Sequence, residues 1–325
     1  MPDGLARAGE GRLHVVFGTG QVGLALANHL AGIGAAVRAV SRHRPAALVS
    51  GIDWRAADAA DPDAACSAAE GATVVYQCLN APYTQWPERF PPLQRGVLTA
   101  AERTGALLVS LENLYGYGPP GGRPMTEDLP LAAITVKGRT RAAMTRELLA
   151  AAEAGRVRIA IGRASDFFGA GVTDGSTLGE RVFGNALAGR RADFIGNPDL
   201  PHTYSYVPDI AAGLAVLGTD DRAAGGVWHL PGPATVTTRE ILRLVSAEVG
   251  HPVGVRSVPK LALRALGAVS PMMRALAEMS YEFDAPFVLD TSKFQSVFGP
   301  AGTPVAAAIA TTVAWYRDLA RPRRA

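Results

Sequence analysis

The stretch Leu13–Gly23, with the sequence LHVVFGTGQVG, carries the strongest indication of the fold of this chain. Its first five residues are mostly apolar, as in a buried strand, and the residues after the glycines have the spacing of a helix. Between the two, Gly18 permits a tight turn, Gly20 allows a pyrophosphate to approach the backbone, and Gly23 lets the helix pack on the strand. The free N–H groups at the helix start, together with the helix dipole, favour a bound anion there. The residues expected to surround it are Gly18, Thr19, Gly20, Gln21, Val22 and Gly23.

Composition indicates a globular protein of ordinary charge. The chain has 325 residues, of which 48% are hydrophobic, and a formal net charge of +3. Arg321, Arg323 and Arg324 supply as many positive charges, so the rest of the chain is close to neutral and no nucleic-acid-binding face is expected. Cys66 and Cys78 match no metal or redox spacing, and no apolar run is long enough to span a membrane. We therefore expect a cytoplasmic protein with reduced thiols, no metal and no membrane partner.

Strands and helices are expected to alternate along the first half of the chain. After the first strand, apolar runs predict strands at residues 35–40, 52–56, 73–78, 106–110 and 157–161. Helical spacing is found at residues 94–104 and 139–154. The alternation predicts an α/β fold built on a doubly wound, parallel Rossmann sheet.

Beyond Arg163 the pattern changes. Helices are expected at residues 178–187, 209–217, 238–249 (with Thr237 as N-cap), 261–279 and 305–319, and short strands at 204–207 and 227–230. We therefore expect a dinucleotide-binding domain over residues 12–166 and 204–232, and a smaller α+β substrate-binding domain over 167–203 and 233–320. The first eleven residues and the last few are expected to be solvated tails.

The second expected strand ends in Ser41-Arg42-His43-Arg44, the place where such folds bind the adenosine ribose of a dinucleotide. An acidic residue here would bind the 2′-hydroxyl of NAD and repel a 2′-phosphate. None is present, and arginine binds phosphate bidentately. The sequence therefore favours NADP(H) over NAD(H), through Ser41, Arg42 and Arg44, with a solvated basic loop as the alternative.

Several further motifs follow in order along the chain: Asp58, Leu114-Tyr115-Gly116, Thr126-Glu127-Asp128-x-Pro130, Arg163, Val207-x-Asp209 and Trp228-His229-Leu230-x-Gly232. With the glycine motif, they resemble the extended short-chain dehydrogenase/reductase family, of the NAD-dependent epimerase/dehydratase type. The resemblance covers most of the chain and implies a cofactor domain, a smaller substrate domain and commonly a homodimer through paired helices. We add to the predicted cofactor contacts Asp58, which could reach the adenine amino group, and Leu79, Asn80, Ala81, Lys137, Arg141 and Arg163.

The catalytic set of that family is not present in its usual form. The family uses a serine or threonine and a Tyr-x-x-x-Lys helix, in which the tyrosine moves a proton and the lysine holds the nicotinamide ribose. Counting from the motifs places the tyrosine position on Lys137, the lysine position on Arg141 and the hydroxyl position on Leu111. The resemblance therefore implies an atypical member. Arg141 could still bond the ribose hydroxyls.

Another group must then supply the proton, because losing a positioned acid typically costs about 10²–10⁴ in rate. Lys137 is one candidate. The alternative interpretation is that Lys137 is a surface residue at the start of the helix without a catalytic role. Tyr115, with Asn113 beside it, is a second, with a structural role as its alternative. Tyr83 and His202 are further candidates. The alternative interpretation of His202 is a solvated histidine in a loop, without a catalytic role.

The expected substrate side carries few cations. Lys260, Arg264, Arg274 and Lys293 are scattered among apolar residues, and the candidate walls are Tyr83, Trp86, Phe167, Phe168 and Met273. This balance favours a small, largely apolar carbonyl substrate over a nucleotide sugar. We predict an NADPH-dependent reductase or isomerase, of a kind used in secondary metabolism. Two alternatives stay open: a non-catalytic NADP-binding sensor or regulator similar to NmrA-type proteins, and a nucleotide-sugar epimerase or dehydratase.

Overall fold

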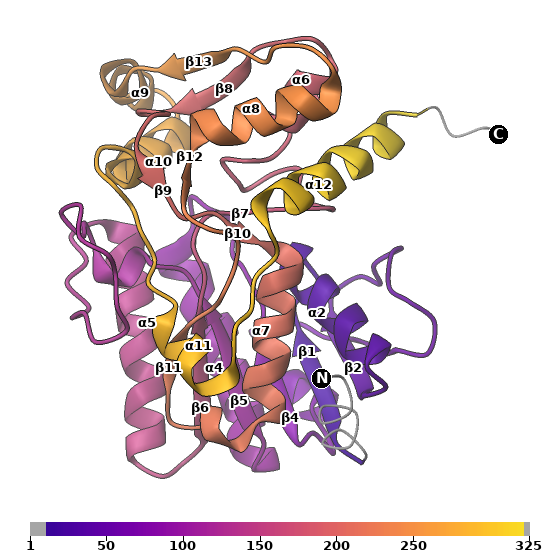
Figure 1. The fold of residues 1–325 in the computed structure, drawn as a ribbon. Coiled ribbons are helices and arrows are strands. Elements are labelled where there is room, and N and C mark those ends of the chain that lie inside the picture. Colours follow the sequence, from indigo (N-terminus) through magenta and orange to yellow (C-terminus); the bar gives the residue numbers. More distant parts are fainter. Residues whose placement is uncertain (1–10, 322–325) are drawn as a thin grey trace. The chain divides into compact units, whose positions relative to one another are not determined.

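The computed structural model describes residues 11–321, which form two compact units (Figure 1). The first comprises residues 11–118, 130–164 and 210–230, and the second comprises 119–129, 165–209 and 231–321. The second unit thus also takes residues 119–129, and the chain returns to the first unit at 210 rather than at the predicted 204. The predicted solvated tails fall almost entirely outside the described residues.

Within the described part of the chain, the first unit is built on a sheet of seven strands in the order β11-β6-β5-β4-β1-β2-β3. All neighbours pair in parallel. The strands are β1 (Leu13–Phe17), β2 (Ala36–Ser41), β3 (Asp53–Ala56), β4 (Val74–Gln77), β5 (Leu107–Glu112), β6 (Arg158–Arg163) and β11 (Val227–His229). The predicted doubly wound parallel sheet is therefore confirmed. The strand order reverses between β1 and β4, which is where open α/β sheets bind their ligands.

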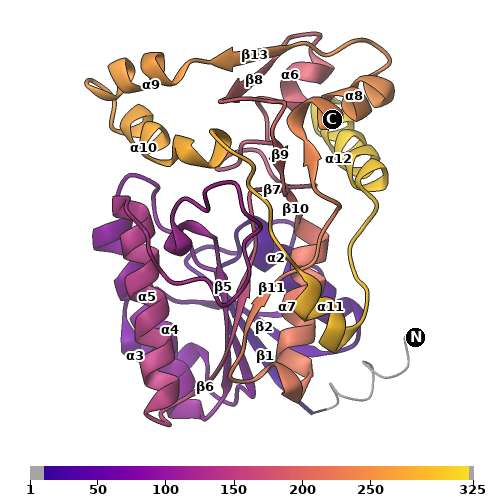
Figure 2. The same ribbon diagram turned by 60° about the vertical axis from the view of Figure 1, so that its left-hand side comes forward.

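Helices cover both faces of this sheet. They are α2 (Gln21–Gly32), α3 (Pro62–Ala68), α4 (Trp86–Thr104), α5 (Val136–Glu153) and α7 (Val207–Thr219), which begins in the second unit. In Figure 2, α3, α4 and α5 lie on one face of the sheet and α2 and α7 on the other. This arrangement buries an apolar core of strand and helix residues, including Val15, Phe17, Val75, Val97, Leu108, Leu148 and Ile161.

Two helices of the first unit differ from the prediction. Helix α4 begins at Trp86, well before the predicted residue 94. A proline suits the first turn of a helix, but Pro91 and Pro92 lie inside α4, where proline normally interrupts helical hydrogen bonding. Helix α3 was not predicted, because it is short. It is capped by Asp61, whose side chain accepts hydrogen bonds from the two backbone N–H groups of Asp63 and Ala64.

The second unit combines short strand pairs with helices. Strand β8 (Ala192–Ile195) pairs in parallel with β13 (Val255–Val258), β7 (Phe167–Phe168) in parallel with β10 (Ser205–Tyr206), and β9 (Pro201–His202) antiparallel with β12 (Val236–Thr237). Its helices are α6 (Phe183–Leu187), α8 (Thr238–Val249), α9 (Lys260–Gly267), α10 (Pro271–Met279), α11 (Ser292–Phe298) and α12 (Val305–Ala320). Helices α6, α8 and α12 enclose a core that includes Phe183, Ile241, Val245, Ile309 and Tyr316.

Three helix predictions in this unit have different outcomes. Helix α8 has the predicted bounds, because Thr237 and Glu240 form a reciprocal capping box at its start. The predicted helix 178–187 is wrong over its first half, where the Leu178 N–H bonds the side chain of Ser176 instead of continuing a helix. The predicted segment 261–279 is divided, because Ser270 caps a new helix at Pro271.

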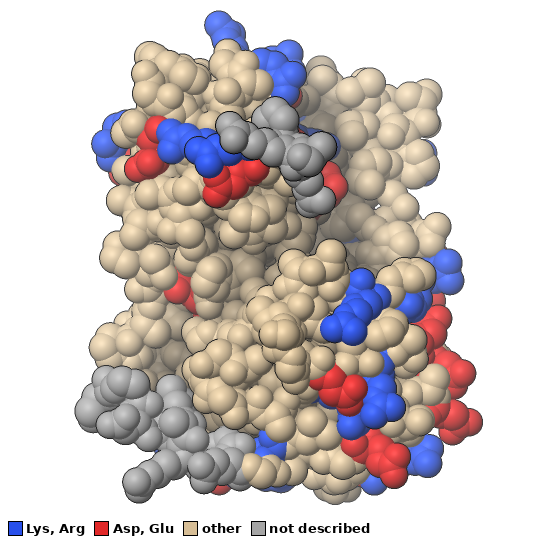
Figure 3. All heavy atoms as spheres, turned by 90° about the vertical axis from the view of Figure 1, so that its right-hand side faces the viewer, with Lys and Arg blue, Asp and Glu red and all other residues tan. Residues whose placement is uncertain are grey.

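None of the helices within residues 11–321 combines the length and the apolar character needed to cross a bilayer. On the face shown in Figure 3, the Lys and Arg side chains are interspersed with Asp and Glu side chains.

One buried histidine makes the stability of the first unit depend on pH. The side chain of His14 is fully buried in β1, where its Nδ1 lies 3.0 Å from the Tyr76 hydroxyl and Nε2 has no partner among the described residues. Burial, together with the positive charge of Arg12, lowers the pKa of His14 from 6.5 to about 4. The unfolded chain therefore binds a proton at His14 more readily than the folded chain does. We expect the free energy of unfolding to be highest above pH 6.5 and to fall by roughly 3 kcal/mol as the pH drops to 4.

A His14→Gln chain isolates this effect, because glutamine does not titrate. The difference in unfolding free energy between the natural chain and the variant, measured with urea at several pH values, should shrink as the pH falls from 6.5 to 4. A difference that stays constant over this range would contradict the assignment.

Candidate functional site

The glycine turn between β1 and α2 is shaped by two different demands. At Gly18, with φ of 91°, an added Cβ would lie 2.7 Å from the Cys78 carbonyl oxygen, and at Gly23 it would lie 1.8 Å from the Gly18 oxygen. These two glycines are therefore required by packing within the protein. At Gly20, the N-cap of α2, an added Cβ would meet nothing within 4 Å. The helix start has neither a side-chain cap nor an acidic residue in its first turn, so its N–H groups fit a pyrophosphate placed over Gly20.

The basic loop after β2 leaves its cations exposed. Arg42, His43 and Arg44 are all exposed, whereas the hydroxyl of Ser41 donates to the His43 carbonyl oxygen at 2.8 Å and accepts from the Trp54 indole at 3.1 Å. Ser41 therefore shapes the loop, and the two arginines are the groups available to an external phosphate. Their contact with a 2′-phosphate stays a prediction.

The remaining predicted cofactor contacts lie near strand ends of the same sheet. Asp58 follows β3 and accepts from the Ala60 N–H at 3.0 Å. Leu79, Asn80 and Ala81 follow β4, and the Leu79 backbone nitrogen lies against Gly18. Their contacts with a dinucleotide also stay predictions.

Helix α5 carries two buried cations one turn apart. Thr135 caps the helix by accepting from the Gly138 N–H at 3.0 Å. Lys137 and Arg141 follow, with only 5% and 3% of their surfaces exposed. The alternative of a surface lysine at position 137 is therefore wrong. Gly138 is needed here, because an added Cβ would lie 2.6 Å from the Tyr115 carbonyl oxygen.

Three of the predicted catalytic residues, Lys137, Tyr83 and Tyr115, lie together. The Lys137 Nζ lies 4.6 Å from the centre of the Tyr83 ring. The Tyr83 hydroxyl is 3.4 Å from the Tyr115 hydroxyl, and the Tyr115 ring stacks on Trp86. Asn113 lies nearby in sequence, but its side chain accepts from the Tyr115 N–H at 3.3 Å and so stabilises the turn.

A network of buried charges, which the sequence did not reveal, lies around the end of β5. Glu112 accepts hydrogen bonds from Arg163 Nε at 3.1 Å and from the Thr145 hydroxyl at 2.9 Å. The Arg163 guanidinium lies over the Tyr117 ring, and the Tyr117 hydroxyl is 2.7 Å from His229 Nε2. The only available signal was a glutamate two residues after the predicted strand 106–110.

Arg141 belongs to the same network. Its Nη2 donates to the Leu111 carbonyl oxygen at 3.2 Å, and its Nε has no partner among the described residues. Burial lowers the pKa of Arg141, while the charge of Glu112 acts in the opposite direction. Arg163, by contrast, is hydrogen-bonded directly to Glu112. The predicted cofactor contacts of both arginines stay predictions.

His202, the remaining catalytic candidate, lies in the second unit. It is 3% exposed, its Nε2 is 2.9 Å from Asp166 Oδ2, and its ring is stacked between aromatic neighbours that include Phe283 and Phe287. The alternative of a solvated loop histidine is therefore wrong. Burial and the nearby Asp166 raise the pKa of Glu282 well above its ordinary range.

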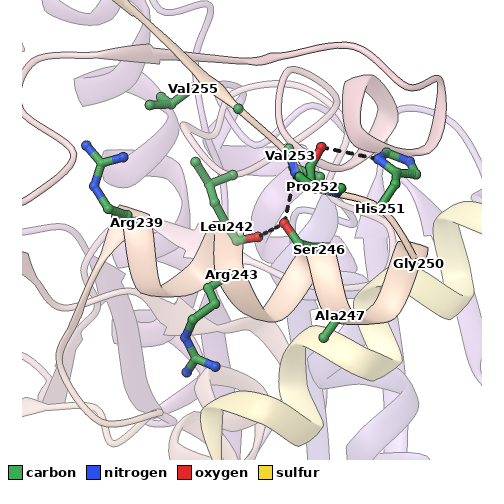
Figure 4. A pocket seen from close by; sticks show the side chains of 11 residues that line it. Arg239, Leu242, Arg243, Ser246, Ala247, Gly250, His251, Pro252, Val253 and Val255 are labelled. Atoms are coloured by element: carbon green, nitrogen blue, oxygen red, sulfur yellow. Dashed lines mark hydrogen bonds between the residues drawn. The ribbon is translucent and has the colours of Figure 1, made fainter.

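A surface hollow on the second unit contains none of the predicted site residues. It is lined by α8 and the loop after it, from Arg239 to Val255 (Figure 4). Arg239 and Arg243 point in different directions, and Arg239 is paired with Asp199. Ser246 bonds the backbone of Leu242 and Val253, so no set of polar groups converges in this hollow.

A doubly wound parallel sheet with an open glycine turn at its switch point is the architecture of a dinucleotide-binding protein. A model of the NAD dependent epimerase/dehydratase family matches residues 15–229. The chain therefore belongs to this family, which confirms the resemblance inferred from its motifs and the prediction of an NAD(P)-dependent enzyme.

Two similar proteins act on sugars linked to dTDP. The chain is 27% identical over 273 residues to the dTDP-6-deoxy-L-talose 4-dehydrogenase (NAD(P)(+)) of Kitasatospora kifunensis, covering 76% of this chain and 82% of that protein. It is 29% identical over 287 residues to the dTDP-4-dehydrorhamnose reductase of Streptomyces griseus, covering 84% of each.

Solved structures share the fold. The dTDP-glucose 4,6-dehydratase DesIV from Streptomyces venezuelae, solved with NAD and TYD bound, superposes with a TM-score of 0.79 at 17% identity, over 94% of this chain and 97% of that one. An epimerase from Methanothermobacter thermautotrophicus gives a TM-score of 0.80 at 17% identity, over 98% and 96%. These similarities confirm the predicted Rossmann architecture.

Proposed function

We propose that this chain is an NADP(H)-dependent oxidoreductase that reduces a ketone or oxidises the corresponding alcohol, with Lys137 as the group that exchanges the proton. The observation that carries the proposal is the burial of Lys137 beside Tyr83 and Tyr115, at the position where the family has its proton-transferring tyrosine. When bound, the nicotinamide supplies the hydride, and the protein has to orient the carbonyl and manage the proton.

The side chains of α5 and β5 suit that task. Lys137 can donate a hydrogen bond to a carbonyl oxygen and pass it a proton as negative charge develops there. Arg163 is paired with Glu112, and the charge of the same carboxylate also acts on Arg141, so two buried guanidinium groups depend on one carboxylate. The excess positive charge stabilises a substrate oxygen that becomes anionic in the transition state.

The substrate class that we propose is the ketone of a nucleotide-linked sugar. It is supported by the two curated relatives, whose names place their reactions on dTDP-sugars. The small apolar carbonyl compound predicted from the sequence is the second candidate. It is favoured by the cluster of Tyr83, Trp86, Phe90 and Tyr115 near Lys137, and by the pairing of Lys260 with Asp284, which leaves that lysine less available to a diphosphate.

The test is hydride transfer from NADPH carrying deuterium at C4. The full chain is incubated with a dTDP-4-keto-6-deoxysugar or with a panel of apolar enones and aldehydes, and deuterium is followed into the product by mass spectrometry. Deuterium in the sugar product supports the main proposal, and deuterium only in apolar products supports the second. Epimerisation without net NADPH loss, or tight NADP binding without any turnover, would overturn both in favour of an epimerase or a non-catalytic sensor.

The cofactor preference gives a separate prediction. Replacing Arg42 with glutamate should weaken NADPH binding about 100-fold, because a charge-assisted hydrogen bond worth about 1.5–3 kcal/mol is replaced by repulsion. NADH, which lacks the 2′-phosphate, should be affected less than about threefold. Both dissociation constants can be measured by fluorescence titration. Arg89→Glu, the same charge change at an exposed position of α4, serves as the control, and equal weakening of both cofactors by Arg42→Glu would remove the 2′-phosphate role.

A further inference from the structure

Two aromatic rings, Tyr83 just before α4 and Phe90 within α4, each contact one of the two buried cations of α5. Lys137 Nζ lies 4.6 Å from the centre of the Tyr83 ring, and Arg141 Cζ lies 4.7 Å from the centre of the Phe90 ring. Residues four apart lie on one face of a helix, so both cations point toward the same segment. The two ring contacts therefore join the start of α5 to the start of α4.

The Tyr83 ring is itself held in place. Trp86 packs edge-on against Tyr83 with ring centres 5.5 Å apart, and it also contacts the rings of Phe90 and Tyr115. The Trp86 indole donates to the Ala81 carbonyl oxygen at 3.1 Å. Trp86 is only 4% exposed, and the partly buried Tyr83 ring packs against it.

A lysine that replaces a tyrosine needs such a support. A tyrosine hydroxyl is fixed by a rigid ring with two rotatable bonds, whereas the ammonium of lysine ends a flexible four-carbon chain. The face of an aromatic ring attracts an ammonium group but offers no base to accept its proton.

We propose that Tyr83 is a positioning residue for Lys137, whose ring face fixes the ammonium at the place where the proton is exchanged. This assignment rests on the proposed function of Lys137 and replaces the direct catalytic role predicted for Tyr83. The hydroxyl of Tyr83 is secondary in this arrangement, because the contact with Lys137 is made by the ring.

The lysine content of the chain allows a direct test. Lys137, Lys260 and Lys293 are its only lysines, so a chain labelled with ¹³C at the lysine ε carbons gives three lysine signals. Lys260→Arg and Lys293→Arg assign two of them. We expect the ε protons of Lys137 to be shifted upfield by the ring current of Tyr83. Tyr83→Phe should keep this shift and Tyr83→Leu should abolish it.

The matched control is Phe90→Leu, which removes a ring from the same cluster but not the ring over Lys137. It should leave the Lys137 signal in place. Turnover should fall about 2–30-fold in Tyr83→Leu, the range that corresponds to the loss of a cation–π contact of about 0.5–2 kcal/mol. Tyr83→Phe should keep kcat within about twofold, and the KM for NADPH should change little in either variant. If Tyr83→Leu does not fold, Tyr83→Met supplies the same comparison.

The outcomes separate this inference from the proposed function. A Lys137 signal that is not shifted, or that moves as much in Phe90→Leu as in Tyr83→Leu, overturns the positioning role even if the chain turns over. If the Lys137 signal depends on Tyr83 but the chain transfers no hydride to any ketone, the proposed function is wrong. The contact between Tyr83 and Lys137 then has no role in catalysis.

Discussion

Replacing Lys137 with methionine is expected to lower kcat for hydride transfer by about 10²–10⁴-fold, because the reaction loses its positioned proton donor. Methionine has a similar length and fills the buried space that the lysine stem occupies. The dissociation constant for NADPH should therefore stay within about threefold. Steady-state kinetics and a binding titration on the same preparations measure the two effects separately.

Lys293→Met is the matched control, since it makes the same change at an exposed lysine in the second unit. It should leave turnover unchanged. Lys137→Tyr, which places the family's residue at this position, should keep more activity than Lys137→Met. A Lys137→Met chain with full turnover would remove Lys137 from the chemistry and direct attention to Tyr115 or His202.

Replacing Glu112 with glutamine is expected to reduce the unfolding free energy by about 3–5 kcal/mol, since it leaves buried guanidinium charge without its carboxylate. Glu112 and Arg163 have side chains that are 2% and 4% exposed, so solvent cannot compensate for the loss. The change is nearly isosteric, and Thr145 can still donate to the remaining amide oxygen. Urea unfolding followed by circular dichroism gives the difference.

Asp53→Asn provides the comparison at a surface ion pair. Asp53 binds Arg38 at 2.8 Å, but its side chain is 43% exposed, and we expect a cost below about 1 kcal/mol. Adding Arg163→Met to Glu112→Gln should recover part of the lost stability, because one unpaired charge is removed. If Glu112→Gln and Asp53→Asn lowered the free energy of unfolding equally, the buried carboxylate would contribute no more to stability than a surface ion pair does.

The local signals in the sequence predicted the parts of the fold that depend on near neighbours. Strand β1 and the glycine turn were predicted because the apolar run and the glycine spacing lie within one stretch. Helix α8 was predicted with its bounds because Thr237 and Glu240 mark its start only three residues apart. The prediction for helix α4 began too late, at residue 94, because Pro91 and Pro92 lie inside the helix, where proline normally interrupts helical hydrogen bonding.

The site depended on contacts between residues distant in sequence. Counting from a family motif placed the family's tyrosine position on Lys137, but the surroundings of this lysine depend on Tyr83 and the Trp86 cluster on another segment. The pairing of Glu112 with Arg163 joins two strand ends separated by the whole of α5. His202 is buried because distant Phe283 and Phe287 stack on it. A single sequence names such residues as candidates but does not show which of them meet.

We expect the turn at Gly20 to hold the pyrophosphate of a dinucleotide at the start of α2. Calorimetric titration of the full chain with NADP and NAD tests it directly, with Gly20→Ala as the variant and Gly32→Ala as the control, since an added Cβ meets nothing within 4 Å at either position. We predict that the natural chain and Gly32→Ala bind NADP equally. Gly20→Ala should fold normally but bind at least about tenfold more weakly, a loss of about 1.4 kcal/mol. Folded natural chain that binds neither dinucleotide, or a Gly20→Ala chain that binds as tightly as the natural one, would contradict the account.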